Sequence, residues 1–182
     1  MVGAGIHAGS RRDALLAWKL GGTHALDPLM AHHLAAAVIT LLGAERSVTL
    51  VPVPSTRRSR RERGRDLVAD LATAAARSLG AVGVDATSLG CLRLVRQTGD
   101  QHALGRLERS RNLAGSMRSI VVPQGLVVVV DDVVTTGSTA REAARALAAA
   151  GVVEVLGAAA VVVAPAGSAA VAGHPPDGLR SR

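Results

Sequence analysis

The sequence is almost without aromatic side chains: it contains no phenylalanine and no tyrosine, and Trp18 is its single large ring. Aromatic residues make up 1% of the chain, whereas hydrophobic residues make up 48%. Valine, leucine and alanine must therefore form the core, a composition that is typical of parallel strands covered by alanine-rich helices. The same scarcity disfavours a single-strand nucleic-acid interface, because such interfaces stack bases on aromatic rings.

Cysteine is also scarce, and Cys91 is the only one in 182 residues. One thiol forms neither an internal disulfide nor a zinc site of paired cysteines, so we expect a reducing, cytoplasmic setting. We expect Cys91 to be a small core residue rather than a nucleophile. The first ten residues lack the apolar run of a signal peptide, and the uncharged residues 155–173 are expected to form a strand and a loose tail rather than to insert into a membrane.

Lys19 is the only lysine, so the net charge of +7 comes almost entirely from arginine. A basic chain attracts polyanions such as nucleic acid, pyrophosphate or an anionic membrane surface. A compositional bias of the genome explains the same charge. Charge alone therefore selects no function.

Helix-like and strand-like segments alternate along the chain. Apolar residues at helical spacing predict helices at residues 11–20, 25–42, 66–79 and from Ser138 to just before Gly151. Short apolar runs predict strands at residues 48–53, 89–95, 120–122, 126–130 and 152–163. Thr139 and Glu142 have the spacing of a capping box, and Gly151 stands where a left-handed helix cap is expected.

This alternation predicts an α/β fold with a central parallel sheet of about five strands flanked by helices. In such sheets ligands bind beyond the carboxyl ends of the strands. The chain is long enough for one domain, which we place at residues 1–163. Residues 164–182 are rich in glycine, proline and alanine, and we expect them to form a disordered tail.

The most informative segment is residues 127–139, which reads VVVVDDVVTTGST. A buried strand delivers Asp131 and Asp132 at its carboxyl end, and a turn of small residues then leads into a helix. Gly137 lets an anion approach the backbone, and the unpaired N–H groups of a helix start favour a phosphate. Carboxylates would repel a phosphate in the same position, so we expect them to bind a different group of the ligand. Ribose hydroxyl groups are suitable donors for them. The alternative is a buried strand that happens to end in an acidic turn before a capped helix.

Two other nucleotide signatures are missing. The sequence GxxxxGK[ST] does not occur, and GxGxxG does not follow any predicted strand. Residues 127–139 instead resemble the motif with which type I phosphoribosyltransferases bind 5-phosphoribosyl-1-pyrophosphate (PRPP). The resemblance implies that Asp131 and Asp132 hold the ribose 2′- and 3′-hydroxyl groups. It implies that the 5-phosphate is bound by Thr135, Thr136, Gly137, Ser138 and Thr139.

The resemblance also implies a reaction. Family enzymes transfer the phosphoribosyl group from PRPP to a nitrogen nucleophile and release pyrophosphate. Mg²⁺ is expected to be bound through PRPP rather than by a dedicated set of protein ligands. We therefore expect no metal site of the chain's own, and the adjacent His32 and His33 are expected to be surface or core-edge residues.

Further motifs are similar to the competence protein F (ComF) family over residues 13–163. They are VPVPS at 51–55 with the arginine cluster that ends in Arg63-Gly64, RQTGDQHAL at 96–104 and RNLAG at 111–115. The resemblance implies a pyrophosphate loop with Ser55, Thr56, Arg57 and Arg58. It also implies a mobile hood over residues 93–111 that carries Arg96, Thr98, Gln101 and Arg111.

Two features depart from that family. Its members commonly begin with a four-cysteine zinc module, which this chain lacks, so either the branch is shortened or the start is trimmed. Arg65-Asp66-Leu67 also stands where many relatives have an aromatic residue followed by Asn-Gln. The second departure leaves side-chain contacts in this loop open.

Three functions stay open at this point. The first is a phosphoribosyltransferase. The second is a non-catalytic PRPP-binding protein in DNA uptake with the competence machinery, which is favoured because residues 161–167 supply no aromatic side chain to stack on a nucleobase. The third is a single-stranded DNA binder that uses the arginine cluster, although a solvated helix face explains most of those arginines equally well. The sequence leaves the oligomeric state open, and a dimer is compatible with it.

Overall fold

The computed structural model describes residues 2–3, 10–20, 24–95 and 113–163. These residues form an α/β domain around a five-stranded, fully parallel sheet with the order β1-β7-β6-β2-β3. The strands of this sheet are β1 (Val2–Gly3), β2 (Ser47–Pro52), β3 (Asp85–Ser88), β6 (Val127–Val134) and β7 (Val155–Val163). The predicted α/β fold with about five parallel strands is thereby confirmed.

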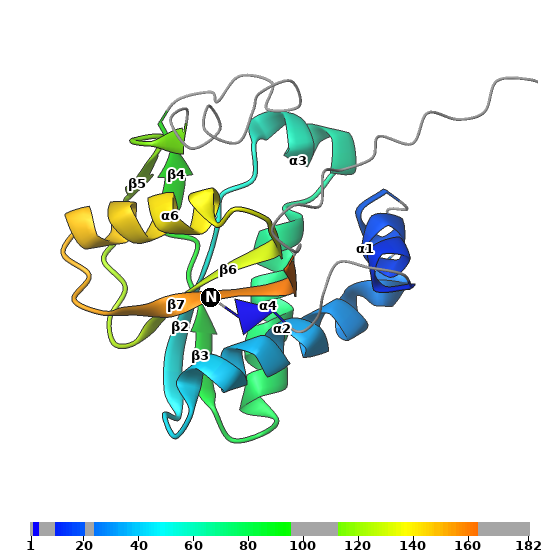
Figure 1. Ribbon diagram of the computed structural model, residues 1–182, viewed down its shortest axis with the longest axis horizontal. Coiled ribbons are helices and arrows are strands. Elements are labelled where there is room, and N and C mark those ends of the chain that lie inside the picture. Colours follow the sequence, from blue (N-terminus) through cyan, green and yellow to red (C-terminus); the bar gives the residue numbers. More distant parts are fainter. Residues whose placement is uncertain (1, 4–9, 21–23, 96–112, 164–182) are drawn as a thin grey trace, which may run out of the picture.

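Helices cover both faces of the sheet (Figure 1). The helices are α1 (Ser10–Leu20), η1 (His24–Leu26, a 3-10 helix), α2 (Asp27–Leu42), α3 (Arg57–Arg63), α4 (Leu67–Gly80) and α6 (Ser138–Ala149). A separate antiparallel ribbon of β4 (Leu92–Leu94) and β5 (Met117–Ser119) lies beside α6.

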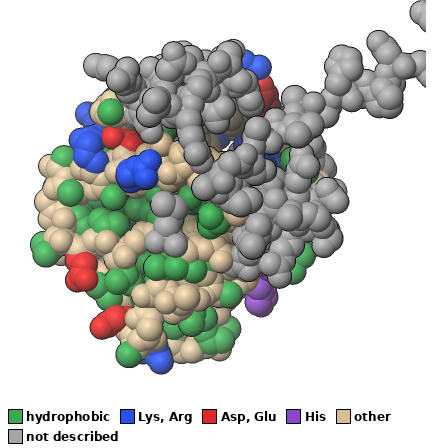
Figure 2. Space-filling model, in the orientation of Figure 1, with side chains coloured by type: hydrophobic (Ala, Val, Ile, Leu, Met, Phe, Trp, Pro, Cys, Tyr) green, Lys and Arg blue, Asp and Glu red, His purple; other side chains and the backbone are tan. Residues whose placement is uncertain are grey.

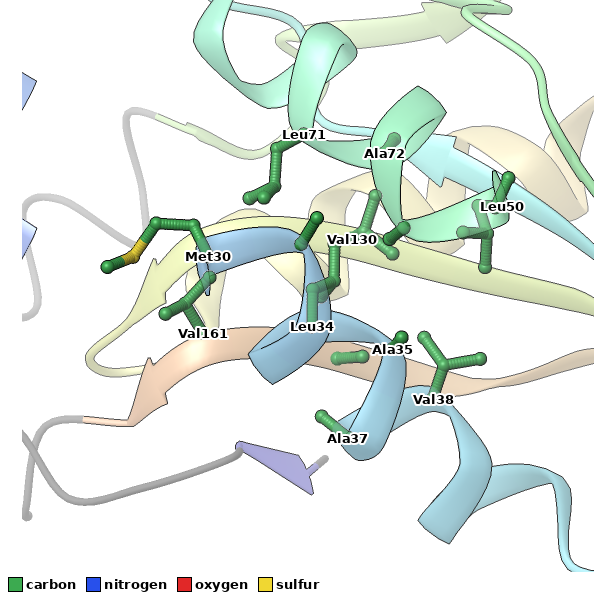
Figure 3. Close-up of a cluster of buried hydrophobic side chains, with 14 of the residues drawn as sticks. Met30, Leu34, Ala35, Ala37, Val38, Leu50, Leu71, Ala72, Val130 and Val161 are labelled. Carbon is green, nitrogen blue, oxygen red and sulfur yellow. The ribbon is translucent and has the colours of Figure 1, made fainter. Parts of the chain in front are cut away.

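The core has two parts, one on each face of the sheet. Side chains from α1, α2 and α4 pack on one face against alternate valines of β6, including Val128 and Val130. Figure 3 shows this cluster, with Leu34 of α2 beside Val130 and with Leu71 and Ala72 contributed by α4. The intervening valines, Val127 and Val129, pack on the other face against α6 and the ribbon. Because β6 is buried on both faces, its continuous valine run is explained.

The four predicted helices are confirmed within a few residues, as α1, α2, α4 and α6. On α4 the predicted apolar face, which includes Leu67, Leu71 and Leu79, is buried in the core. Trp18 and Cys91 are also buried, as expected of packing residues. Gly151 follows α6 with a φ of 98°, a left-handed conformation that confirms its predicted place at the end of the helix.

The strand predicted at residues 89–95 is confirmed in part, as the shorter β4 of the ribbon, whereas the strand predicted at residues 120–122 was wrong. The chain forms β3 at Asp85–Ser88, which the sequence did not reveal because an edge strand with few apolar residues has no hydrophobic pattern. It then turns at Gly90 and continues as β4 of the ribbon. Residues 120–122 are exposed, and the short strand lies just before them, at β5.

The predicted end of the acidic strand at residue 130 was also too early. β6 continues through Asp131 and Asp132 to Val134, because its ladder with β7 persists as far as the pair Val134 and Val163. The acid pair therefore belongs to the last half of the strand.

The capping box at Thr139 and Glu142 was wrong. α6 begins at Ser138, and Gly137 caps it without a side-chain hydrogen bond. The Glu142 carboxylate is buried instead between the helix and the ribbon, where it accepts a hydrogen bond from the backbone N–H of Met117. Glu142 therefore bonds to Met117, which is distant in sequence, instead of capping the start of its own helix.

One helical stretch of the described chain, His24–Leu42, is long and apolar enough to cross a membrane by length and composition. Its mean hydropathy is 1.5, and 39% of it is buried inside the fold. Its inner residues, such as Leu34 and Val38, contribute to the core against the sheet. The same features are found in core helices, so this finding is weak evidence for a membrane span.

Candidate functional site

The turn between β6 and α6 is built as the sequence suggested. Gly137 has a φ of 72°, a left-handed conformation that glycine adopts without strain. The hydroxyl oxygens of Thr136 and Ser138 lie 2.8 Å apart, and the Ser138 N–H donates to Thr136 Oγ1 at 3.3 Å. Arg141 places a guanidinium nitrogen 3.4 Å from the Ser138 hydroxyl. The turn therefore combines hydroxyl groups, the N-terminal end of a twelve-residue helix and one cation, a set that suits a phosphate.

The acid pair precedes this turn, and both of its side chains are partly buried. The carboxylate of Asp131 turns back to accept a hydrogen bond from the backbone N–H of Asp132 at 2.8 Å. The carboxylate of Asp132 forms an ion pair with Lys19 at the end of α1, with Nζ and Oδ2 2.6 Å apart. The two carboxylates thus have different partners although they are adjacent in the chain.

The electrostatics of the pair are dominated by burial. Burial raises the pKa of Asp131 well above its ordinary value, and the neighbouring carboxylate of Asp132 raises it further. The backbone hydrogen bond from Asp132 and the charge of Lys19 oppose this shift but do not cancel it. Asp131 therefore holds its proton more tightly than an exposed aspartate does, which is typical of functional sites and also of buried ion-pair networks.

A hollow of about 470 Å³ lies at the end of β2, beside the acid pair's strand. Its walls are the loop after β2, the start of α3 and the β4 strand, and three arginines line it: Arg57, Arg60 and Arg93. Asp66 is the only carboxylate among its described lining residues. The hollow is therefore electropositive and suits a small polyanion. Among the residues described, the acid pair and the turn after it do not line this hollow, so it is a neighbour of their site rather than the same cavity.

Two residues of the predicted pyrophosphate loop line the hollow, and the other two have structural partners on α3. Ser55 and Arg57 line the hollow, and the Ser55 hydroxyl donates to Asp66 Oδ1 at 2.7 Å. Thr56 caps α3 by accepting a hydrogen bond from the Ser59 N–H. Arg58 does not line the hollow and pairs with Glu62, one turn further along α3, at 2.8 Å.

The departure from the family pattern at residues 65–66 has a structural explanation. Arg65 donates to both carboxylate oxygens of Asp27, at 2.9 and 3.1 Å, and contacts the Asp70 carboxylate at 2.9 Å. Trp18 also donates its indole N–H to Asp27, at 2.6 Å. Burial opposes ionisation of Asp27, but the hydrogen bonds from Arg65, Trp18 and His24 outweigh it and lower the pKa of Asp27 to about 2. Through these contacts Asp27 and Arg65 join α1, α2 and the start of α4.

The ribbon of β4 and β5 is attached to α6 by Glu142. Burial opposes the charge of this carboxylate, but hydrogen bonds from Arg145 and from the backbone lower the pKa of Glu142 below its ordinary value. Arg145 also donates to the Met117 carbonyl at 2.9 Å. Figure 2 shows Lys and Arg side chains gathered near α6 and the ribbon on this face of the molecule. The predicted hood residues between the two strands, Arg96, Thr98, Gln101 and Arg111, lie outside the described residues.

Sequence reasoning missed three side chains of this region: Lys19, Arg60 and Arg93. Lys19 had one available signal, since it is the only lysine of an arginine-rich chain and stands at the end of a helix. Arg60 belonged to the arginine cluster and Arg93 to the predicted hood, but neither could be singled out, because its place in the hollow depends on how α3 and the ribbon pack. Within the described ranges no group of three or more histidine, cysteine or acidic residues is arranged to hold a metal ion.

No protein-family model matches this sequence, and no curated protein matches it.

Proposed function

We propose that this protein binds PRPP as a type I phosphoribosyltransferase does and transfers its phosphoribosyl group to a nitrogen nucleophile, releasing pyrophosphate. The observation that carries the proposal is the adjacency of two strand ends. Pro52 of β2 pairs with Val130 of β6, and the Val53 N–H donates to the Val130 carbonyl at 3.0 Å. The arginine-lined hollow and the acid pair with its phosphate turn therefore lie at the same edge of the sheet.

Each part of PRPP has a chemically suitable neighbour at this edge. Carboxylates accept hydrogen bonds from hydroxyl groups, so Asp131 and Asp132 suit the ribose diol. The turn at Gly137 and the start of α6 suit the 5-phosphate. Arg57, Arg60 and Arg93 suit the pyrophosphate, because guanidinium groups make paired contacts with phosphate oxygens. Mg²⁺ would be bound through the oxygens of PRPP and would neutralise part of the departing charge.

The transfer step requires the bond between C1 of the ribose and the pyrophosphate oxygen to break as the nitrogen nucleophile attacks. The transition state carries positive charge on the ribose ring and negative charge on the pyrophosphate. Anionic oxygen beside the ring and arginines beside the leaving group both stabilise that charge separation. In this proposal Asp131 and Asp132 supply the anionic oxygen, and the arginines of the hollow stabilise the leaving group.

The second candidate is a PRPP-binding protein without turnover that acts in DNA uptake, as the ComF resemblance implies. The observation that favours it is the lack of a stacking platform. Trp18, the only large aromatic side chain of the sequence, is 1% exposed and is bonded to Asp27. At the end of β7, Val161 and Val162 are buried in the core. A nucleobase acceptor would therefore find no large ring to stack on.

Calorimetric titration with PRPP and Mg²⁺ tests the proposed pocket. Wild-type protein should bind, and the double variant Asp131→Asn/Asp132→Asn should bind at least roughly tenfold more weakly, since it loses hydrogen bonds to charged groups. Asp85→Asn, a change at an exposed aspartate on the edge strand, is the matched control. Equal affinity in the double variant and the wild type would count against the assignment.

A screen for pyrophosphate release separates the two candidates. Protein and PRPP are incubated with nucleobases and with simple amines, and release of pyrophosphate identifies an acceptor. Release that depends on Asp131 and Asp132 supports the enzyme. Binding of PRPP without release for any acceptor supports the binding protein.

A further inference from the structure

Lys19 forms the shortest side-chain contact of the acid pair. Its Nζ lies 2.6 Å from Asp132 Oδ2, and the two side chains are only 22% and 13% exposed. A lysine in the last turn of a helix is also stabilised by the helix dipole, so its position alone has an ordinary explanation. The helix dipole does not explain, however, why the Lys19 side chain points to the Asp132 carboxylate.

The helix that carries Lys19 is held in place by its neighbours. Trp18 and Leu15 of α1 are each 1% exposed and belong to the core. The indole N–H of Trp18 donates to Asp27 Oδ1 at 2.6 Å, and Asp27 also accepts two hydrogen bonds from Arg65. Because Trp18 and Lys19 are adjacent, this anchor fixes the end of α1 beside β6.

The other charged groups around β6 are engaged elsewhere. On α6, Arg141 contacts the Ser138 hydroxyl, and Glu142 pairs with Arg145. Behind the sheet, Arg65 pairs with Asp27 and with Asp70. The neighbouring strands β2 and β7 carry no charged residue. Within the described part of the chain, Lys19 is therefore the cation in contact with the pair.

We propose that Lys19 is a positioning residue of the acid pair, and that its ammonium fixes the orientation and the charge of the Asp132 carboxylate so that the pair presents an ionised oxygen to its ligand. For PRPP as that ligand, this inference rests on the proposed function. Two adjacent, partly buried carboxylates repel each other, and one nearby cation offsets part of that repulsion. Without it the pair holds protons more tightly, as the effect of Lys19 on the pKa of Asp131 indicates. A protonated carboxyl group is a poorer acceptor for the ribose hydroxyl groups.

The test compares Lys19→Met, which keeps the aliphatic stem and removes the charge, with Lys19→Arg, which keeps the charge. Arg46→Met is the control, because it removes one exposed positive charge that bonds only to nearby backbone carbonyls. At pH 7 we expect Lys19→Met to weaken binding of PRPP with Mg²⁺ by roughly tenfold or more. The loss should shrink as the pH is raised, because the pair then ionises without the lysine. Lys19→Arg should stay close to wild type.

A ligand-free measurement separates this inference from the proposed function. Carboxyl ¹³C resonances of labelled aspartate report the titration of the pair without any PRPP. We expect the upper titration step of the pair to move to higher pH in Lys19→Met and to return in Lys19→Arg. If wild-type protein binds no PRPP, the proposed function fails, and this titration still decides the role of Lys19.

Trp18 fluorescence shows whether α1 stays docked, since no other tryptophan or tyrosine contributes to the signal. With Trp18 still buried, an unchanged titration and an unchanged pH profile of binding in Lys19→Met overturn the inference. If Lys19→Met exposes Trp18, the contact is tested instead in protein that keeps Lys19, by following the ¹³Cε resonance of this single lysine after lysine labelling. It should move in Asp132→Asn and not in Asp85→Asn, and a resonance that Asp132→Asn leaves in place overturns the inference.

Discussion

The Glu142 carboxylate accepts a hydrogen bond from the backbone N–H of Met117 at 3.0 Å, and this contact joins α6 to the ribbon. Glu142 is 5% exposed, and Arg145 pairs with its other oxygen at 2.7 Å. A buried carboxylate without these partners would be strongly unfavourable. The ribbon is therefore tied to α6, the helix that begins at the turn around Gly137.

Replacing Glu142 by Gln should loosen the ribbon. The amide keeps an acceptor for Met117 but loses the charge that pairs with Arg145, so we expect the free energy of unfolding to fall by roughly 1–3 kcal/mol. Urea unfolding measures this change, and hydrogen exchange at the Met117 amide should become faster. Glu45→Gln, at an exposed position between α2 and β2, is the control. Unchanged exchange at Met117 in Glu142→Gln would show that the contact does not hold the ribbon.

Asp131 should lower stability at neutral pH in the ligand-free protein. Its pKa is raised in the folded state, so the unfolded chain releases this proton first as the pH rises. Stability is therefore lost as the pH rises from the unfolded value of about 3.9 through the folded pKa. Asp131→Asn removes that loss and should be about 1 kcal/mol or more stabler than wild type at pH 7, since one pKa unit corresponds to about 1.4 kcal/mol.

Chemical unfolding of wild type and Asp131→Asn at pH 4 and at pH 7 measures this difference. It should be small at pH 4 and should favour the variant at pH 7, while PRPP binding is weakened. A variant that is less stable than wild type at pH 7 would contradict the raised pKa of Asp131. Greater stability together with weaker binding is the pattern expected of a functional residue.

Asp27 should have the opposite pH dependence. Its pKa is about 2 in the folded state and higher in the unfolded chain, so its contribution is present above pH 4 and is lost as the pH falls through about 2. We expect Asp27→Asn to be less stable than wild type by about 2 kcal/mol at pH 7. The difference should disappear near pH 2, and Trp18 emission should respond because the indole loses a charged acceptor. A constant difference between pH 2 and pH 7 would exclude the linkage.

Pyrophosphate binding should depend on which arginine of α3 is removed. Arg57 and Arg60 line the hollow, whereas Arg61 does not, although it is exposed on the same helix. Arg57→Ala and Arg60→Ala should each weaken pyrophosphate binding by roughly tenfold, and Arg61→Ala, the charge-matched control, by much less. Equal losses in all three variants would mean that only the overall positive charge matters. Titration calorimetry with magnesium pyrophosphate measures the three affinities.

The parts of the fold that the sequence predicted are those with strong local patterns. The valine run of β6 and the apolar face of α4 identify their elements because burial on a sheet or helix face dictates the residue type. β3 was missed because the edge of the sheet imposes no such pattern on Asp85–Ser88. The capping box at Glu142 failed because a partner distant in sequence, Met117, competed for the carboxylate.

In the candidate site too, the features set by local sequence were predicted and those set by tertiary contacts were not. The turn at Gly137 and the place of the acid pair beside it follow from local spacing, and the conformation of Gly137 agrees with that expectation. The partner of Asp132 does not follow from spacing, because Lys19 reaches it from the other end of the sequence. The hollow likewise depends on contacts that form only in the folded chain, since β4 closes a wall whose other residues come from the loop after β2, α3 and the start of α4.

The proposed function requires the end of β6 and the turn after it to bind a ribose phosphate. Amide chemical-shift mapping tests this requirement, by titrating ¹⁵N-labelled protein with PRPP and Mg²⁺. We expect the largest shifts at residues 131–139 and smaller ones along the loop at residues 53–57. Saturable PRPP binding with shifts confined to other parts of the protein, or no binding at millimolar PRPP, would contradict it.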